Sequence, residues 1–190
     1  MQNIITNLIK EGQKTTGALL SKEILEPIEA AAKCIINSLK NGGKVIVFGN
    51  GGSAADSQHM VAELVGRFKK ERKAMPAIAL TANTSTITAL SNDYGYEASF
   101  KRQIEALGKK GDVAIGISTS GTSQNIALAL NQAGQMGLKT VALAGKGGGR
   151  VKGLVDEAIV VKSDNTPRIQ EAHILIIHIL CELIEDALTG

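Results

Sequence analysis

Four side chains suited to metal binding or proton transfer lie on two segments that are far apart in the sequence. His59 and Glu63 are four residues apart in a stretch without proline, so a helix there would place both on one face, one turn apart. Gln170 and His178 belong to the last apolar stretch of the chain. Histidine nitrogens, a carboxylate and an amide oxygen form an acceptable ligand set for a divalent metal, and zinc suits this set best.

Each member of this set also has a simpler interpretation. His59 and Glu63 could be an ordinary pair on a helix surface, which is the commoner result of this spacing. His178 lies among isoleucines and leucines, where a buried imidazole only needs a hydrogen-bond partner. Gln170 and His178 are eight residues apart, about 12 Å along a helix. Both could reach one ion only by leaning toward each other or by coming from different subunits, and the sequence leaves this open.

A glycine-rich turn precedes His59. The apolar run VIVF (45–48) is typical of a buried parallel strand, and it ends in GNGGSA (49–54), with a helix expected from about Ser53. Free backbone N–H groups and the helix dipole at such a point favour an anion. The turn formally fits the dinucleotide pattern G-x-G-x-x-G/A. However, the next strand ends in LTAN (80–83) without the acidic residue that holds a ribose, and no Lys-Ser/Thr follows for a Walker loop.

A second turn, STSGTS (118–123), offers five hydroxyl groups and another helix N-terminus in six residues. Hydroxyls and backbone N–H groups surround a small phosphate monoester well. An ordinary Ser/Thr helix cap is the simpler interpretation, but a cap needs only one hydroxyl. The turn therefore favours phosphate binding.

The elements that must position these side chains alternate between apolar strands and helices. Nearly continuous apolar strands joined by helices predict an α/β fold, with a parallel sheet covered on both faces and ligands at the carboxyl ends of the strands. Residues 4–39 predict two helices that are broken between Gly17 and Ser21. The expected strands are 44–49, 77–80, 113–117, 140–144 and 158–161, and the expected later helices are 84–90, 96–107, 123–136 and a last one ending near 187, with a turn at 92–95.

The composition excludes several classes of protein. The 190 residues include no Trp, 3% aromatic residues and a net charge of +3, which supplies little for stacking on nucleic-acid bases. The one basic cluster, Lys69, Lys70, Arg72 and Lys73, is explained by a solvated helix end or loop. The two cysteines favour buried, reduced thiols. The absence of an apolar leader and of a membrane-length apolar stretch predicts a cytoplasmic protein without membrane contact.

Four blocks occur in order along the chain: GNGGSAADSQHMVAEL (49–64), SND (91–93), STSGTSQN (118–125) and RIQEAHILIIH (168–178). Together they resemble the sugar-isomerase (SIS) domain, and within it the phosphoheptose isomerases, over essentially the whole chain. The resemblance implies one SIS domain over 1–190. It would consist of an N-terminal helical segment (1–40) for oligomerisation and a three-layer, flavodoxin-like α/β core (41–190) with a five-stranded parallel sheet.

The resemblance also implies a function: conversion of sedoheptulose 7-phosphate to D-glycero-D-manno-heptose 7-phosphate in bacterial heptose biosynthesis, as for lipopolysaccharide. It implies a cytoplasmic homotetramer with active sites at subunit interfaces and one zinc ion per subunit. The zinc ligands would be His59, Glu63, Gln170 and His178. The substrate contacts would be Asn50, Gly51, Gly52, Ser53, Glu63, Asn92, Asp93, Ser118, Thr119, Ser120, Ser123 and Gln170.

An aldose–ketose isomerisation needs a base that moves a proton between neighbouring carbons and an acid that serves the oxygens. Glu63 is the expected base and His178 the expected acid, with the metal polarising the carbonyl. A carboxylate bound tightly to zinc is a poorer base, so Glu63 would have to loosen during turnover. The alternative is a non-catalytic SIS tetramer that binds a protein, as the replication-initiator-associating protein does, or a sugar-phosphate sensor. A pure binder would not require both Glu63 and His178.

Overall fold

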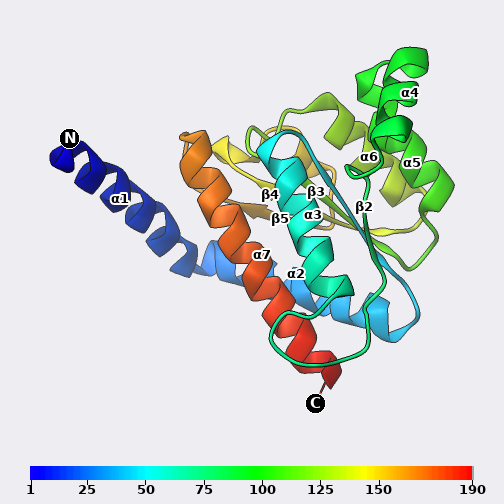
Figure 1. The fold of residues 1–190 in the computed structure, drawn as a ribbon, viewed down its shortest axis with the longest axis horizontal. Coiled ribbons are helices and arrows are strands. Elements are labelled where there is room, and N and C mark those ends of the chain that lie inside the picture. The colour runs from blue at the N-terminus through cyan, green and yellow to red at the C-terminus, as the bar shows by residue number, and fades with distance from the viewer. Residues whose placement is uncertain (190) are drawn as a thin grey trace.

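The computed structural model describes residues 1–189 and shows an α/β fold around one five-stranded sheet (Figure 1). All neighbouring strands are parallel, and their order is β2-β1-β3-β4-β5. The expected flavodoxin-like parallel sheet is therefore confirmed. The strands are β1 (Val45–Gly49), β2 (Ala77–Ala79), β3 (Val113–Ser118), β4 (Lys139–Ala144) and β5 (Glu157–Val160).

Helices cover both faces of this sheet and make three layers. The helices are α1 (Gln2–Gly17), α2 (Lys22–Lys40), α3 (Gly52–Val65), α4 (Thr84–Tyr94), α5 (Ser99–Leu107), α6 (Gln124–Gln135) and α7 (Thr166–Thr189), with short 3₁₀ turns at Ala18–Leu20, Tyr96–Ala98, Lys146–Gly148 and Val151–Gly153. Alternate side chains of a strand point to opposite faces. Val45 and Val47 accordingly pack under α2, α3 and α7, whereas Ile46 and Phe48 pack under α5 and α6.

The N-terminal segment is interrupted at the expected place, because a 3₁₀ turn separates α1 from α2. Helix α1 extends away from the body of the molecule, at the blue end of the ribbon in Figure 1. Thr15 is its one buried residue, while Ile4, Ile5, Leu8 and Ile9 are each about half exposed or more. The helix thus presents an apolar stripe outside the core.

Helix α4 is longer than expected. The predicted turn at 92–95 lies mostly inside it, and the helix ends only at Gly95, whose φ of 83° few other residues adopt. Nothing between Thr84 and Tyr94 is a glycine or proline, so no residue stops the helix earlier. Asn92 and Asp93 are therefore carried on the last turn of a helix.

Three smaller features bear on the composition of the chain. Cys34 and Cys181 are both free thiols, as predicted, but only Cys181 is buried, whereas Cys34 is half-buried. Within residues 1–189, no helix is long and apolar enough to cross a bilayer. The solvated-loop interpretation of the basic cluster is wrong for Arg72, whose side chain is only 5% exposed.

Candidate active site

His59, Glu63 and His178 meet at one point between α3 and α7. The Nε2 atom of His59 lies 3.1 Å from the Nε2 atom of His178 and 3.1 Å from Oε1 of Glu63. One ligand atom from each of the three residues lies within 4.8 Å of the others. The cluster is partly open to solvent, since His59 is exposed and the other two are half-buried. The expected i, i+4 pair on α3 is therefore joined by a residue 119 positions away.

The atoms of this cluster fit a metal ion. The Nε2 atom of His59 carries at most one hydrogen, so an N–H there can serve either Glu63 or His178 but not both. A cation between the three atoms would satisfy all of them. Two ligands of a tetrahedral zinc stand about 3.3 Å apart, close to both observed separations, and three protein ligands with an open position are typical of catalytic zinc.

The fourth expected ligand, Gln170, lies elsewhere on α7. Its side-chain amide packs against Gly52 at the start of α3, where a Cβ atom would overlap its nitrogen. His59 follows Gly52 by seven residues, about 10 Å along the helix axis. One chain therefore brings three of the four expected ligands together and places Gln170 at the glycine turn. The role of Gln170 as a ligand stays a prediction.

The first glycine turn is shaped so that the N-terminus of α3 stays open. Gly51 has φ 56° and ψ −120°, a conformation that side chains with a Cβ rarely adopt, and no side chain caps the helix there. A Cβ at Gly49 would overlap the backbone of Ser53. The glycines thus permit a tight turn that leads directly into a helix N-terminus, and such termini favour anions.

The second turn places hydroxyl groups at the N-terminus of α6. The hydroxyl of Ser118 donates to that of Ser123 over 3.1 Å, and Ser120 accepts from the amide and the hydroxyl of Thr122. Ser123 occupies the cap position, yet its side chain makes no capping hydrogen bond. The simple cap interpretation is therefore wrong for Ser123. Backbone packing of Gly121 against Gly148 fixes the turn from behind.

Asn125 and Tyr96, which were not expected to be site residues, connect the two turns through Asn50. Asn50 and Asn125 pair their side-chain amides in both directions, at 2.9 and 2.8 Å, and the hydroxyl of Tyr96 donates to Oδ1 of Asn50 over 2.8 Å. Asn125 is 4% exposed, so its amide is fixed within the fold. The sequence signal for Asn125 is its position: it is a polar residue on the first turn of a helix that follows a hydroxyl-rich loop. Tyr96 has no comparable signal in the sequence.

The expected substrate contacts Asn92 and Asp93 are exposed, whereas Thr119 in the second turn is half-buried. Asn92 and Asp93 lie on the last turn of α4, where Nδ2 of Asn92 donates to Oδ1 of Asp93 over 2.9 Å. They come three or four residues before Tyr96, which reaches Asn50 in the first turn. The end of α4 is therefore connected to the glycine turn by a short path.

A comparison with known proteins decides the family. Residues 13–145 match the SIS domain family. A phosphoheptose isomerase of Geotalea daltonii is 55% identical over 90% of this chain and 89% of its own length, and one of Clostridium acetobutylicum is 49% identical over 100% and 97%. The solved structure of a phosphoheptose isomerase from Francisella tularensis superposes with a TM-score of 0.93 at 38% identity, covering 97% of this chain and 98% of that one.

The chain belongs to the phosphoheptose isomerase family. The expected family and the expected enzyme class, a phosphosugar isomerase, are both confirmed. The family does not by itself assign roles to individual residues of this chain, so those rest on the geometry above.

Of the two histidines on α7, His173 and not His178 is the core histidine. His173 is fully buried, and its Nε2 atom lies 3.1 Å from the carbonyl oxygen of Ala144. Burial lowers its pKa to about 4, against a smaller opposing effect of that hydrogen bond.

Asp56 on α3 is a further group near the cluster that was not expected from the sequence. Burial raises the pKa of its carboxyl, and the nearby His59 opposes this shift.

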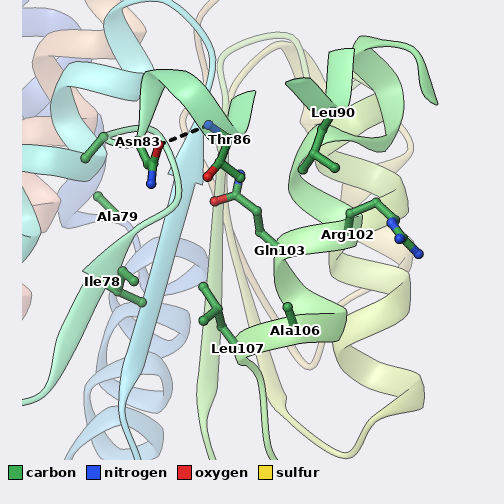
Figure 2. A pocket seen from close by; sticks show the side chains of 10 residues that line it. Ile78, Ala79, Asn83, Thr86, Leu90, Arg102, Gln103, Ala106 and Leu107 are labelled. Carbon is green, nitrogen blue, oxygen red and sulfur yellow. Dashed lines mark hydrogen bonds between the residues drawn. The ribbon is translucent and has the colours of Figure 1, made fainter. Parts of the chain in front are cut away.

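A cavity of about 580 Å³ lies apart from these turns, between β2, α4 and α5 (Figure 2). Its lining is mostly apolar and includes Ile78, Leu90 and Leu107, with Arg102 and Gln103 beside them. None of the expected site residues lines it. The cavity therefore coincides with neither turn.

Proposed function

We propose that the chain interconverts sedoheptulose 7-phosphate and D-glycero-D-manno-heptose 7-phosphate, in a cytoplasmic pathway of heptose biosynthesis. The observation that carries this proposal is the meeting of His178, from α7, with His59 and Glu63 on α3, the helix that begins at the first glycine turn. A pure binding module of this fold has no need for a carboxylate and two imidazoles at one point.

The proposed chemistry uses Glu63 and His178 in complementary roles. Glu63 takes the proton from the carbon beside the carbonyl and returns it to the neighbouring carbon, while His178 moves a proton between the two oxygens. A zinc ion held by His59, Glu63 and His178, with Gln170 as a further ligand, would polarise the carbonyl. Partial exposure of the cluster leaves room for the sugar oxygens to approach.

The two turns would hold the phosphate. Ser53, Ser118, Ser120 and Ser123 supply hydroxyls, and the uncapped N-termini of α3 and α6 supply N–H groups. The cluster begins about 10 Å further along α3. This separation is comparable to the length of an extended seven-carbon sugar phosphate, so one substrate could span both groups.

We further propose that the chain, as a single SIS domain, assembles into a homotetramer with active sites at subunit interfaces. The exposed apolar stripe on α1 supports association, because contiguous apolar patches on a protein surface are usually buried in an interface. The position of Gln170 also supports association. Within one chain, Gln170 lies at the glycine turn and does not reach the His59–Glu63–His178 cluster. A second copy could supply the missing ligand.

The reaction is tested with Glu63→Gln and His178→Gln. Each variant should lower turnover of sedoheptulose 7-phosphate by at least 10³-fold, the scale of a lost general base or acid, while the protein stays folded and assembled. Product is followed by NMR, with and without a chelator. Glu182→Gln, an exposed glutamate on the same α7, is the matched control and should remain fully active. Full activity of either site variant would refute the assignment of roles.

The interface is tested by mixing two inactive variants, Gln170→Ala and Glu63→Gln, after joint refolding. If a site combines Gln170 of one subunit with the cluster of another, mixed tetramers regain part of the wild-type activity. If every site lies within one chain, mixing restores nothing, and the interface proposal fails.

A further inference from the structure

The loop between α3 and β2, residues 66–76, is held by a carboxylate from the far end of the chain. Glu185 on α7 is 2% exposed and accepts hydrogen bonds from the backbone amides of Phe68, Lys69 and Lys70, at 3.1, 2.8 and 2.9 Å. Nε of Arg72 donates to the same carboxylate over 3.0 Å. Four donors thus compensate one buried charge, which would be costly without them.

Arg72 connects this carboxylate to the end of α3. Its Nη1 atom donates to the carbonyl oxygens of Leu64 and Gly66, at 2.9 and 3.1 Å, and its Nη2 atom donates to that of Glu63 over 2.8 Å. The last carbonyls of a helix have no partner within the helix. Arg72 therefore caps α3 at the turn that carries Glu63.

The same loop contacts the other half of the cluster. Phe68 is half-buried, and its ring centroid lies 5.7 Å from that of His178, at an interplanar angle of 37°. The ring of His178 in turn lies 5.1 Å from that of His59. One short loop therefore reaches Glu63 through its backbone and His178 through a side chain.

We propose that the buried pair of Glu185 and Arg72 is a positioning device for the His59–Glu63–His178 cluster. It fixes the end of α3 and the ring of Phe68 relative to α7, and so sets the distance between Glu63 and His178. Stability alone is a weak reason for such a pair, because well-packed apolar residues often stabilise a buried position equally well. The expected effect on catalysis rests on the proposed function. The expected effect on metal binding does not, because it can be measured without a substrate.

Surface ion pairs between the same two elements provide matched controls. Lys69 pairs with Glu182 over 2.6 Å, and Lys70 pairs with Asp186 over 2.8 Å, all on exposed side chains. Neither pair contacts α3 or the three cluster residues directly, although Nζ of Lys69 lies 5.5 Å from the centroid of the Phe68 ring. The Lys70–Asp186 pair is therefore the cleaner control. Glu182→Gln and Asp186→Asn should therefore leave both metal affinity and turnover unchanged.

The test uses Arg72→Lys and Glu185→Gln in the full-length protein, with Phe68→Leu as a variant that leaves the ion pair intact. Zn²⁺ affinity is measured by competition with a chromophoric chelator, the Co²⁺ absorption spectrum reports ligand geometry, and thermal unfolding reports stability. We expect Zn²⁺ affinity to fall at least tenfold in Arg72→Lys and Glu185→Gln, with an altered Co²⁺ spectrum. In the isomerase assay kcat should fall at least tenfold while KM changes less than threefold.

Two results would overturn the proposal. One is a folded Arg72→Lys or Glu185→Gln protein with wild-type Zn²⁺ affinity, Co²⁺ spectrum and kcat, whatever its melting temperature. The other is an equal loss of metal affinity in the surface controls. If both ion-pair variants fail to fold, Phe68→Leu decides, because a wild-type Co²⁺ spectrum there contradicts coupling through the loop. An inactive wild type would reject the proposed function alone, since metal affinity is measured without sugar.

Discussion

His173 should make the stability of this protein depend on pH. The imidazole is fully buried, its Nε2 atom lies 3.1 Å from the carbonyl oxygen of Ala144, and its Nδ1 atom has no partner among residues 1–189. Burial lowers the pKa of His173 to about 4. The folded protein therefore keeps this ring neutral at a pH where the unfolded chain protonates it.

The sign and size of the effect follow from linkage. Between about pH 6.5, the ordinary pKa of histidine, and pH 4, the unfolded chain binds more protons at this position than the native state. Acidification through this window therefore destabilises the fold. A shift of about 2.5 units at 1.36 kcal/mol each gives about 3 kcal/mol in total, of which about 2 kcal/mol appears between pH 7.5 and 5.

The assay is urea unfolding at pH 7.5 and pH 5, at one protein concentration and with a chelator present. His173→Gln keeps an N–H donor but does not titrate, and the carbonyl oxygen of Ala144 keeps its bond from the amide of Val161, at 2.8 Å. The wild type should lose about 2 kcal/mol more than the variant on acidification. Equal pH dependence in both proteins would show that His173 is not buried in its neutral form.

Two further substitutions probe the turns. Gly52→Ala would place a Cβ on the side-chain amide of Gln170. We therefore expect kcat/KM to fall at least tenfold, while the free energy of unfolding measured in urea changes by less than about 1 kcal/mol. The control is Gly134→Ala, at a helical position with nothing within 4 Å of the added Cβ, and it should leave kcat/KM unchanged. Asn125→Leu leaves the Asn50 amide without its reciprocal partner and should lower the free energy of unfolding in urea by about 1–3 kcal/mol. The same variant should raise the KM for the sugar phosphate. An unchanged KM would mean that the amide pair does not shape the phosphate site.

Much of the fold could be predicted because its signals are local. The five apolar runs, the break after Gly17 and the glycine turn before α3 all follow from short-range periodicity and turn chemistry. The i, i+4 spacing of His59 and Glu63 likewise needs only a helix. The end of α4 was mispredicted, since Asn92 and Asp93 favour turns without forbidding a helix, and only Gly95 ends it.

The sequence by itself determined the α/β fold, the glycine-rich and hydroxyl-rich turns, and the residue types of the candidate site. The tertiary structure decided which of these residues meet. It separated His173, which points into the core, from His178, which reaches His59, although both lie on α7. It also paired Arg72 with Glu185 across 113 residues. Local patterns reflect backbone geometry within a few residues, whereas such pairings depend on how whole helices pack against one sheet, and no short stretch of sequence carries that information.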